Sequence, residues 1–180
     1  SLIQSIFVGF GSALVPDGMG FALQSRGAAF SLDEGHPNAY APGKRPFHTI
    51  IPAFVMYDGS PLLSFGVMGA DMQPQGQVQT LLNMLDFAMN PYDAGAAPRI
   101  RHDGLNAPHS TQISDAGIVY PEAAISEKIV SALRSCGHTV RAATDPVEHF
   151  MGGYQCVRRE AEGYSGASEP RFDGCALGVG

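Results

Sequence analysis

Two stretches of the sequence combine residue types that suit acyl-transfer chemistry. Residues 42–54 read PGKRPFHTIIPAF, a loop that prolines stiffen and that carries two adjacent cations. Residues 66–87 begin GVMGADMQPQ, a glycine turn that leads into a helical pattern. Consecutive backbone amides at such a turn, beside the positive end of a helix dipole, can stabilise an oxyanion. The two stretches together predict a site that holds a substrate anion next to a developing oxyanion.

The composition describes a globular protein and argues against two classes of partner. Of the 180 residues, 44% are hydrophobic and 16% are charged, which is typical of a folded domain. The net charge of −6 offers no basic surface to nucleic acid, and no apolar run reaches the roughly 18 residues of a membrane span. We therefore predict a single domain over residues 1–180, with a small-molecule substrate and no membrane or nucleic-acid partner. A cytoplasmic location is expected, with the periplasm as the alternative.

Neither the cysteines nor the histidines have the spacing of a metal site. Cys136, Cys156 and Cys175 are too far apart for a CxxC motif, so free thiols in a reducing compartment are expected. His102 and His109 flank a loop without an HExxH pattern. No metal and no organic cofactor is expected.

Two segments show the three- and four-residue spacing of an amphipathic helix. The first is predicted from residue 74 to about residue 90, and the second over residues 121–136. The apolar residues that define their inward faces are Val78, Leu81, Leu82, Leu85 and Met89 in the first, and Ile125, Ile129, Val130 and Leu133 in the second. Both helices are expected to pack on a sheet.

Short apolar runs between glycine and proline residues predict the strands of that sheet. The turn Asp58-Gly59-Ser60 should join the second and third strands as a hairpin. The polar loop 31–44 is expected to form a wall or a lid of the site. The predicted strands are residues 2–7, 50–57, 62–67, 113–119, 139–143, 149–157 and 163–167. This order of elements predicts an α+β sandwich.

Six short motifs, in one order along the chain, resemble the small-subunit part of γ-glutamyltranspeptidase-like enzymes. They are residues 10–12, 20–30, 42–46, 66–87, 97–99 and 166–171. Members of this family are N-terminal-nucleophile hydrolases with an αββα sandwich, made as precursors that cleave themselves. The resemblance implies a large-subunit partner from the same precursor and a threonine nucleophile that attacks an amide carbonyl.

That threonine is expected to lie outside this chain. The resemblance places Ser1 in the middle of a strand, about one strand and a turn downstream of the nucleophile. The isolated chain is therefore expected to be inactive. An alternative takes Ser1 itself as an N-terminal nucleophile, with its own α-amine as the general base.

The resemblance also implies roles for individual residues. The glycine pair whose N–H groups form the family's oxyanion hole falls on Gly69 and Ala70, where alanine keeps the N–H but restricts the backbone. Ser5 takes the place of a threonine whose hydroxyl supports the nucleophile, although an ordinary strand serine is an equal alternative. Gln73 and Gln75 follow the oxyanion turn, where they could cap the helix or contact the substrate.

Four positions differ from the glutamyl-specific members of the family. In those members, the positions of Arg26, Ala29, His48 and Thr49 hold the α-amino and α-carboxylate groups of glutamate. Ala29 cannot pair with an ammonium group, whereas Arg26 and His48 add donors for a carboxylate. The sequence of these segments most resembles that of the branch that contains oxamate amidohydrolase. A small anionic amide is therefore the predicted substrate.

Four further alternatives stay open on the sequence alone. The protein could be a γ-glutamyl transferase or hydrolase that acts on glutathione-like substrates, or a degenerate homologue without catalysis. Arg26 could be a surface residue paired with Asp33 or Glu34. The turn at Gly69 could simply join a strand to a helix.

Overall fold

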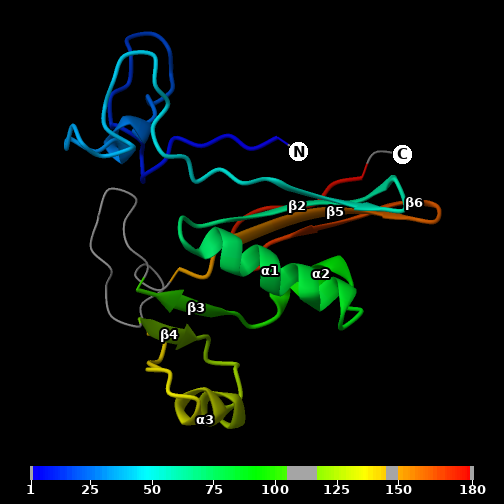
Figure 1. Ribbon diagram of the computed structural model, residues 1–180. Helices are drawn as coiled ribbons and strands as arrows, with labels where there is room; N and C mark the ends of the chain where they lie inside the picture. The colour runs from blue at the N-terminus through cyan, green and yellow to red at the C-terminus, as the bar shows by residue number, and fades with distance from the viewer. Residues whose placement is uncertain (1, 105–116, 145–149, 179–180) are drawn as a thin grey trace. The chain divides into compact units, whose positions relative to one another are not determined.

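The computed structural model describes residues 2–104, 117–144 and 150–178, which fall into two compact units (Figure 1). The N-terminal unit comprises residues 2–50. The sheet unit comprises the described residues from Ile51 onward. That the two units fold together as one domain stays a prediction.

A four-stranded antiparallel sheet forms the frame of the sheet unit. Its strands lie in the order β1-β2-β5-β6. They are β1 (Ala53–Tyr57), β2 (Ser60–Met68), β5 (Gly153–Glu160) and β6 (Gly163–Ser168). The predicted hairpin between the first two is confirmed, since Asp58 and Gly59 have φ values of 48° and 71°. Positive φ at both central residues matches the twist of the flanking strands.

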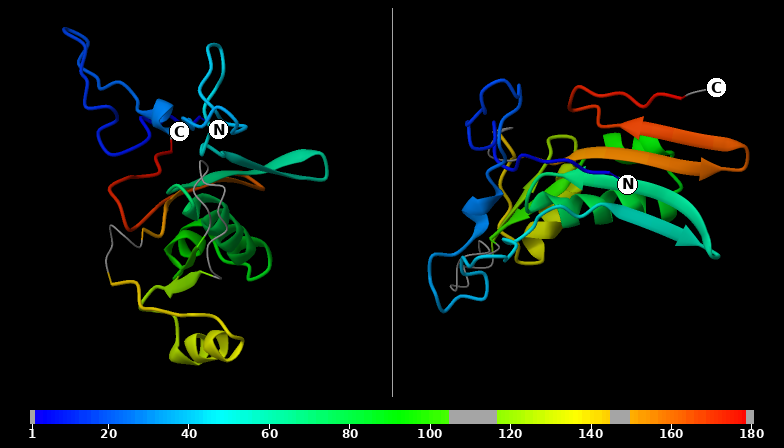
Figure 2. Two further views of the ribbon diagram at one scale, coloured as in Figure 1. Left: turned by 60° about the vertical axis from the view of Figure 1, so that its left-hand side comes forward. Right: turned by 90° about the horizontal axis from the view of Figure 1, so that it is seen from above.

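Helices α1 (Met72–Leu85) and α2 (Pro91–Ala96) lie against one face of this sheet (Figures 1 and 2). The core between the two layers is apolar, and the removal of its side chains from water is the main stabilising contribution to this unit. Its buried residues are Leu63, Phe65, Val67, Met84, Ala94, Tyr154, Cys156 and Ala167. The mixture of helix and sheet confirms the predicted α+β class.

Only part of the predicted apolar face packs on the sheet, since Leu81 and Met89 lie against the core. Val78, Leu82 and Leu85 are exposed, and their predicted burial was wrong. The buried positions instead advance by four residues along the helix, at Met72, Gly76, Thr80 and Met84. A Cβ at Gly76 would lie 2.7 Å from Cγ1 of Val67, so this glycine lets the helix backbone approach the sheet closely.

The helix predicted to about residue 90 ends at Leu85, and a second helix follows from Pro91. The chain leaves α1 after Leu85 and passes through Ala88, whose φ is 53°. A new helix starts at Pro91, where the side chain of Asn90 accepts the backbone N–H of Asp93 at 2.8 Å. An N-cap asparagine followed by proline is a helix-start signal that was present in the sequence.

Two glutamines of α1 anchor the short strand β3 (Ile100–Asp103). The Gln79 amide donates to the Ile100 carbonyl and accepts from the Ile100 N–H, both at 2.9 Å. The Gln75 amide does the same for His102, at 3.1 and 2.8 Å. Four residues of helix and two residues of strand both rise about 6 Å, so the two pairings match. The amides therefore act as a partner strand along one edge, while β4 (Ile118–Pro121) pairs with the other.

We expect Gln79→Met to lower the free energy of unfolding by about 2 kcal/mol, because the N–H and C=O of Ile100 both lose a partner. Urea unfolding measures the change. Gln77 is the matched control, since it donates one hydrogen bond, to the carbonyl of Ile51. Gln77→Met should cost less than about 1 kcal/mol. Equal losses in the two variants would contradict the anchoring of β3.

Several predicted boundaries were wrong. Helix α3 (Glu127–Ser135) is shorter than the predicted 121–136. Residues 2–7 form no strand, and the backbone turns at Phe7, whose φ is 78°. Within residues 139–143 the only pairing among the described residues is a single bridge between Val140 and Val119. The strands predicted at 113–119 and 149–157 lie partly outside the described residues; their described parts contain the beginnings of β4 and β5.

Candidate functional site

The predicted site residues Ser5, Arg26 and Thr49 meet in the N-terminal unit. Arg26 begins the short 3-10 helix η1 (Arg26–Ala29) and is 5% exposed. Its Nη1 donates to Oγ1 of Thr49 at 2.6 Å, and its Nη2 donates to Oγ of Ser5 at 3.1 Å. The ring of Phe7 covers the guanidinium, with its centroid 4.3 Å from Cζ. We call Ser5, Phe7, Arg26 and Thr49 the Arg26 cluster.

The charge of Arg26 has no counter-ion among the described residues. The alternative surface pairing with Asp33 or Glu34 is absent from the described ion pairs, and Asp33 instead accepts the backbone N–H of Gly35 at 2.9 Å. Burial lowers the pKa of Arg26, although a guanidinium remains protonated at neutral pH. A buried, unpaired cation is costly to the fold. The arrangement is therefore suited to binding an anion.

His48 and Ala29 lie beside this cluster in the sequence but contribute differently. His48 is exposed, and its imidazole forms no hydrogen bond with the described residues. The structure therefore does not bring it onto Arg26. Ala29 is buried at the end of η1 and offers no group that could bind a substrate ammonium. Sequence analysis missed one residue of the cluster, Phe7. It contacts Arg26 and has a left-handed backbone conformation.

Gly69 and Ala70 form a tight turn between β2 and α1 in the sheet unit. Both have positive φ, 136° and 48°. Their carbonyls accept the N–H groups of Met72 and Gln73 at 2.9 and 3.1 Å, which starts the helix. Their own N–H groups find no acceptor among the described residues. Two free amides at the positive end of a helix are a suitable oxyanion-binding pair.

Gly69 is required at this turn, whereas Ala70 is tolerated. A Cβ on Gly69 would lie 2.8 Å from Cε1 of Phe150 and 3.0 Å from Cα of Gly152. We expect Gly69→Ala to lower the free energy of unfolding by about 2 kcal/mol, through this overlap and its positive φ. Ala70→Gly should change it by less than about 1 kcal/mol, because relief of strain and added chain entropy oppose each other. Thermal unfolding of both variants measures this difference, and a harmless Gly69→Ala would contradict the close approach.

Gln73 differs from the other glutamines of α1 because its amide has no partner. It is 8% exposed and forms no side-chain hydrogen bond with the described residues. Its amide atoms are not fully enclosed, since the only enclosed, unpartnered side-chain nitrogen or oxygen among the described residues is Nε of Arg99. By contrast, the Gln75 amide is engaged by the backbone of His102. Gln73 is thus the glutamine whose polar atoms remain available to a ligand.

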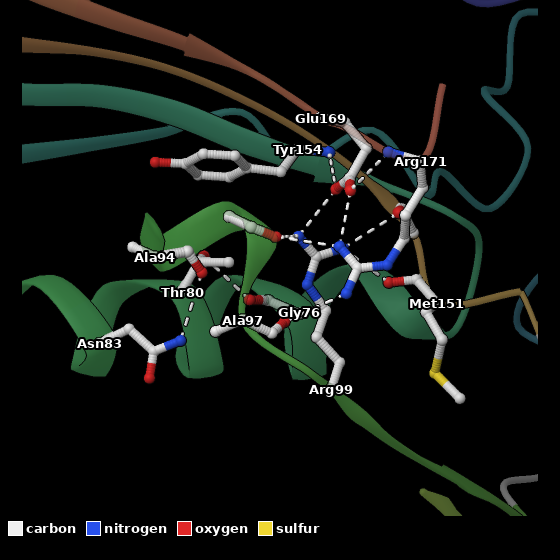
Figure 3. Close-up of polar contacts among 12 residues, drawn as sticks. Gly76, Thr80, Asn83, Ala94, Ala97, Arg99, Met151, Tyr154, Glu169 and Arg171 are labelled. Carbon is white, nitrogen blue, oxygen red and sulfur yellow. Dashed lines mark hydrogen bonds and ion pairs between the residues drawn. The ribbon is translucent and has the colours of Figure 1, made fainter. Parts of the chain in front are cut away.

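A network of buried charges supports the backbone against which the oxyanion turn packs. Nη2 of Arg99 and Oε2 of Glu169 lie 2.7 Å apart, and both side chains are 1% exposed (Figure 3). The other Glu169 oxygen accepts from Arg171 at 2.6 Å, and Arg171 also binds Glu122. Arg99 donates further to the carbonyls of Met151, Gly152 and Gly95. Since the Cα of Gly152 packs at Gly69, the network fixes the backbone against which the turn rests.

We expect this network to make the protein less stable in acid. Burial alone raises the pKa of Glu169, but the hydrogen bond from Arg171 and the charge of Arg99 outweigh it, so the pKa lies below its ordinary value. Such a carboxyl adds stability above its unfolded pKa of about 4.3, and that stability is lost as the pH falls through the folded pKa. Stability should therefore decrease below about pH 4. Urea unfolding as a function of pH measures this loss, and Glu169→Gln should reduce it.

The structure has a further cavity that involves none of the predicted site residues. A cavity of about 410 Å³ lies between β5, β6 and residues 175–178, and none of the predicted site residues lines it. Across residues 2–104, 117–144 and 150–178, no group of three histidine, cysteine or acidic side chains is placed to hold a metal ion. None of the described helices is long and apolar enough to cross a membrane.

The sequence is similar to that of proenzymes about three times its length. It is 36% identical over 179 residues to the oxamate amidohydrolase proenzyme of Klebsiella pneumoniae. It is 35% identical over 188 residues to the glutathione hydrolase-like YwrD proenzyme of Bacillus subtilis. Each match covers 99% of this chain and 33% of the relative. The chain therefore spans about a third of the length of these curated relatives.

Solved structures and a family model agree with these similarities. Cephalosporin acylase from Bacillus halodurans superposes with a TM-score of 0.83 at 41% identity, covering 99% of this chain and 31% of that one. Gamma-glutamyltranspeptidase from Pseudomonas nitroreducens, complexed with L-DON, gives 0.80 at 27% identity, covering 99% and 92%. The expected N-terminal-nucleophile hydrolase fold is thereby confirmed. Residues 1–179 match the model of the Gamma-glutamyltranspeptidase family, and the chain belongs to that family.

Proposed function

We propose that the protein is an amidohydrolase that cleaves the amide of a small anionic carboxylate, with oxamate as the model substrate. The observation that carries this proposal is Arg26, a buried cation with no acidic partner among the described residues. Thr49 and Ser5 hold its guanidinium in place. A substrate carboxylate would supply the missing counter-ion. The name of the 36% identical relative, oxamate amidohydrolase, supports the same substrate class.

The nucleophile in this proposal is an N-terminal threonine in a part of the protein that precedes the present chain. Its hydroxyl attacks the amide carbonyl while its α-amine accepts the proton, and the N–H groups of Gly69 and Ala70 bind the oxyanion. Ser5 supports the threonine, and Gln73 contacts the substrate. The C–N bond of the substrate then breaks, and the leaving nitrogen takes up the proton from the α-amine and departs. Water hydrolyses the acyl-enzyme. No metal or cofactor takes part in these steps.

The partner in this proposal is the large subunit cleaved from the same precursor. The relatives are named as proenzymes, and the chain covers a third of each. It also covers 92% of one chain of the Pseudomonas nitroreducens structure. Both observations support a small subunit that is separated from a preceding portion by processing.

A glutathione hydrolase or γ-glutamyl transferase is the second candidate, because one similar relative carries the name glutathione hydrolase-like. The experiment compares oxamate with a γ-glutamyl anilide as substrates of the processed enzyme, produced from its whole precursor. We expect kcat/KM for oxamate to exceed that for the anilide by at least about 100-fold. No described acidic residue pairs with Arg26, so none is placed there to bind the α-ammonium group of a glutamyl substrate. Faster turnover of the glutamyl substrate would overturn the proposal.

Ser1, the alternative nucleophile, lies outside the described residues. Under this proposal Ser1→Ala keeps the activity of the processed enzyme, whereas alanine in place of the upstream threonine abolishes it. Loss of activity in Ser1→Ala with unchanged processing would instead identify Ser1 as the nucleophile.

A further inference from the structure

We propose that Phe7 is a positioning residue of the Arg26 cluster, which holds the guanidinium edge-on to the substrate carboxylate. This inference rests on the proposed function and adds a determinant of substrate binding to it. The guanidinium Cζ lies 4.3 Å from the centroid of the Phe7 ring, well within the range of a cation–π interaction. Such an interaction is strongest where water is excluded, and Arg26 is 5% exposed.

The backbone at Phe7 shows that the ring is held there against a local preference. Its φ is 78°, a value that a bulky side chain rarely adopts. The N–H of Phe7 donates to Oγ of Ser5 at 3.0 Å, the same oxygen that accepts from Arg26. Ser5 therefore joins the strained backbone to the guanidinium. Strain of this kind persists where the surrounding contacts determine the conformation, and it is common at ligand sites.

The hydroxyl of Ser5 can act only as a donor in this arrangement. A hydroxyl oxygen has two acceptor positions, and the N–H groups of Phe7 and Arg26 occupy both. Its remaining hydrogen must point toward another acceptor. Oγ1 of Thr49 likewise accepts from Arg26, at 2.6 Å. The cluster thus presents donors, which is the requirement for binding an anion.

Arg26 keeps a free donor, its Nε–H, that is accessible to a ligand in the plane of the guanidinium. Two of the five N–H groups of an arginine are used by Thr49 and Ser5, which leaves three. Nε of Arg26, which has no partner, is not fully enclosed, because the only fully enclosed, unpartnered side-chain nitrogen or oxygen among the described residues is Nε of Arg99. Since the Phe7 ring occupies one side of the guanidinium, a carboxylate must approach elsewhere, and bidentate binding is geometrically favoured along the edge.

The test measures steady-state oxamate hydrolysis by the processed enzyme with Phe7→Leu and Phe7→Gly. Both remove the ring, and glycine also accepts the positive φ, so its folding is not at risk from the backbone. We expect KM to rise by about 5- to 30-fold, as for loss of a buried cation–π contact, while kcat changes less than about threefold. Phe7→Tyr keeps the ring and should recover KM to within about twofold of the wild type.

Phe10→Leu is the matched control, because Phe10 lies in the same segment but is 66% exposed. Its KM should stay that of the wild type. If the wild type hydrolyses oxamate and both Phe7→Leu and Phe7→Gly keep its KM, the positioning role of Phe7 is wrong and the proposed function stands. A fall in kcat alone would also overturn the role. If the wild type does not hydrolyse oxamate, the proposed function and this inference both fail.

Discussion

Glu169→Gln is expected to lower the free energy of unfolding by about 3–5 kcal/mol, the typical cost of breaking a buried ion pair. Glutamine nearly preserves the size of the side chain but removes the charge that faces Arg99. Arg99 is itself 1% exposed, so its cation would remain buried without a counter-ion. Arg171 would lose an ionic partner as well, since the second Glu169 oxygen accepts from it at 2.6 Å. Urea unfolding at neutral pH measures the loss.

Glu127 provides a matched control on the surface of the same unit. Its ion pair with Arg134 has a similar separation, 3.0 Å, but the side chains are 77% and 51% exposed. Glu127→Gln should therefore cost less than about 1 kcal/mol, because water and salt screen exposed pairs. A Glu169→Gln variant that is no less stable than Glu127→Gln would show that the buried network does not hold the fold together.

The motifs at 97–99 and 166–171 identified the family, but the sequence did not reveal that they bind each other. Arg99 and Glu169 are separated by 70 positions. Their meeting depends on the order of β5 and β6 in the sheet, which no local pattern specifies. The same limit applies to α1, where the leucines dominate the helical period. The helix instead packs closely on the sheet at Gly76 and Thr80, because small residues allow close packing.

The Arg26 cluster was partly predictable. Arg26 and Thr49 were inferred together from the positions that differ from the glutamyl-specific members, and the structure joins them by a hydrogen bond of 2.6 Å. Phe7 was instead assigned to the end of a strand, since its apolar neighbours fit that pattern. A positive φ at a phenylalanine has no signal in hydrophobic periodicity. Residues held by strain are where local sequence rules are expected to fail.

The Arg26 and oxyanion residues belong to separate compact units, so the distance between them is not a property of either. Each of these two groups of residues is supported by contacts within its own unit. Arg26 is fixed by Thr49, Ser5 and Phe7, and the Gly69 turn is fixed by Phe150 and Gly152. Substrate binding and oxyanion stabilisation should therefore be separable by mutation: changes at the first half alter KM, and changes at the second alter kcat.

Arg26→Lys tests the first half and is expected to raise KM for oxamate by about 100-fold, with a much smaller change in kcat. Lysine retains the positive charge, so the change isolates the geometry of the guanidinium. An ammonium group cannot bind Thr49 and Ser5 through separate nitrogens while it also offers two parallel donors to a carboxylate. Loss of one or two such charge-assisted bonds, at about 1.5–3 kcal/mol each, corresponds to this factor.

Arg45→Lys is the matched control, since Arg45 is exposed and forms no ion pair with the described residues. An unchanged KM in Arg26→Lys would indicate that positive charge alone attracts the substrate, an equal rise in both variants would show that the effect is not specific to Arg26, and a fall confined to kcat would place Arg26 at the transition state instead.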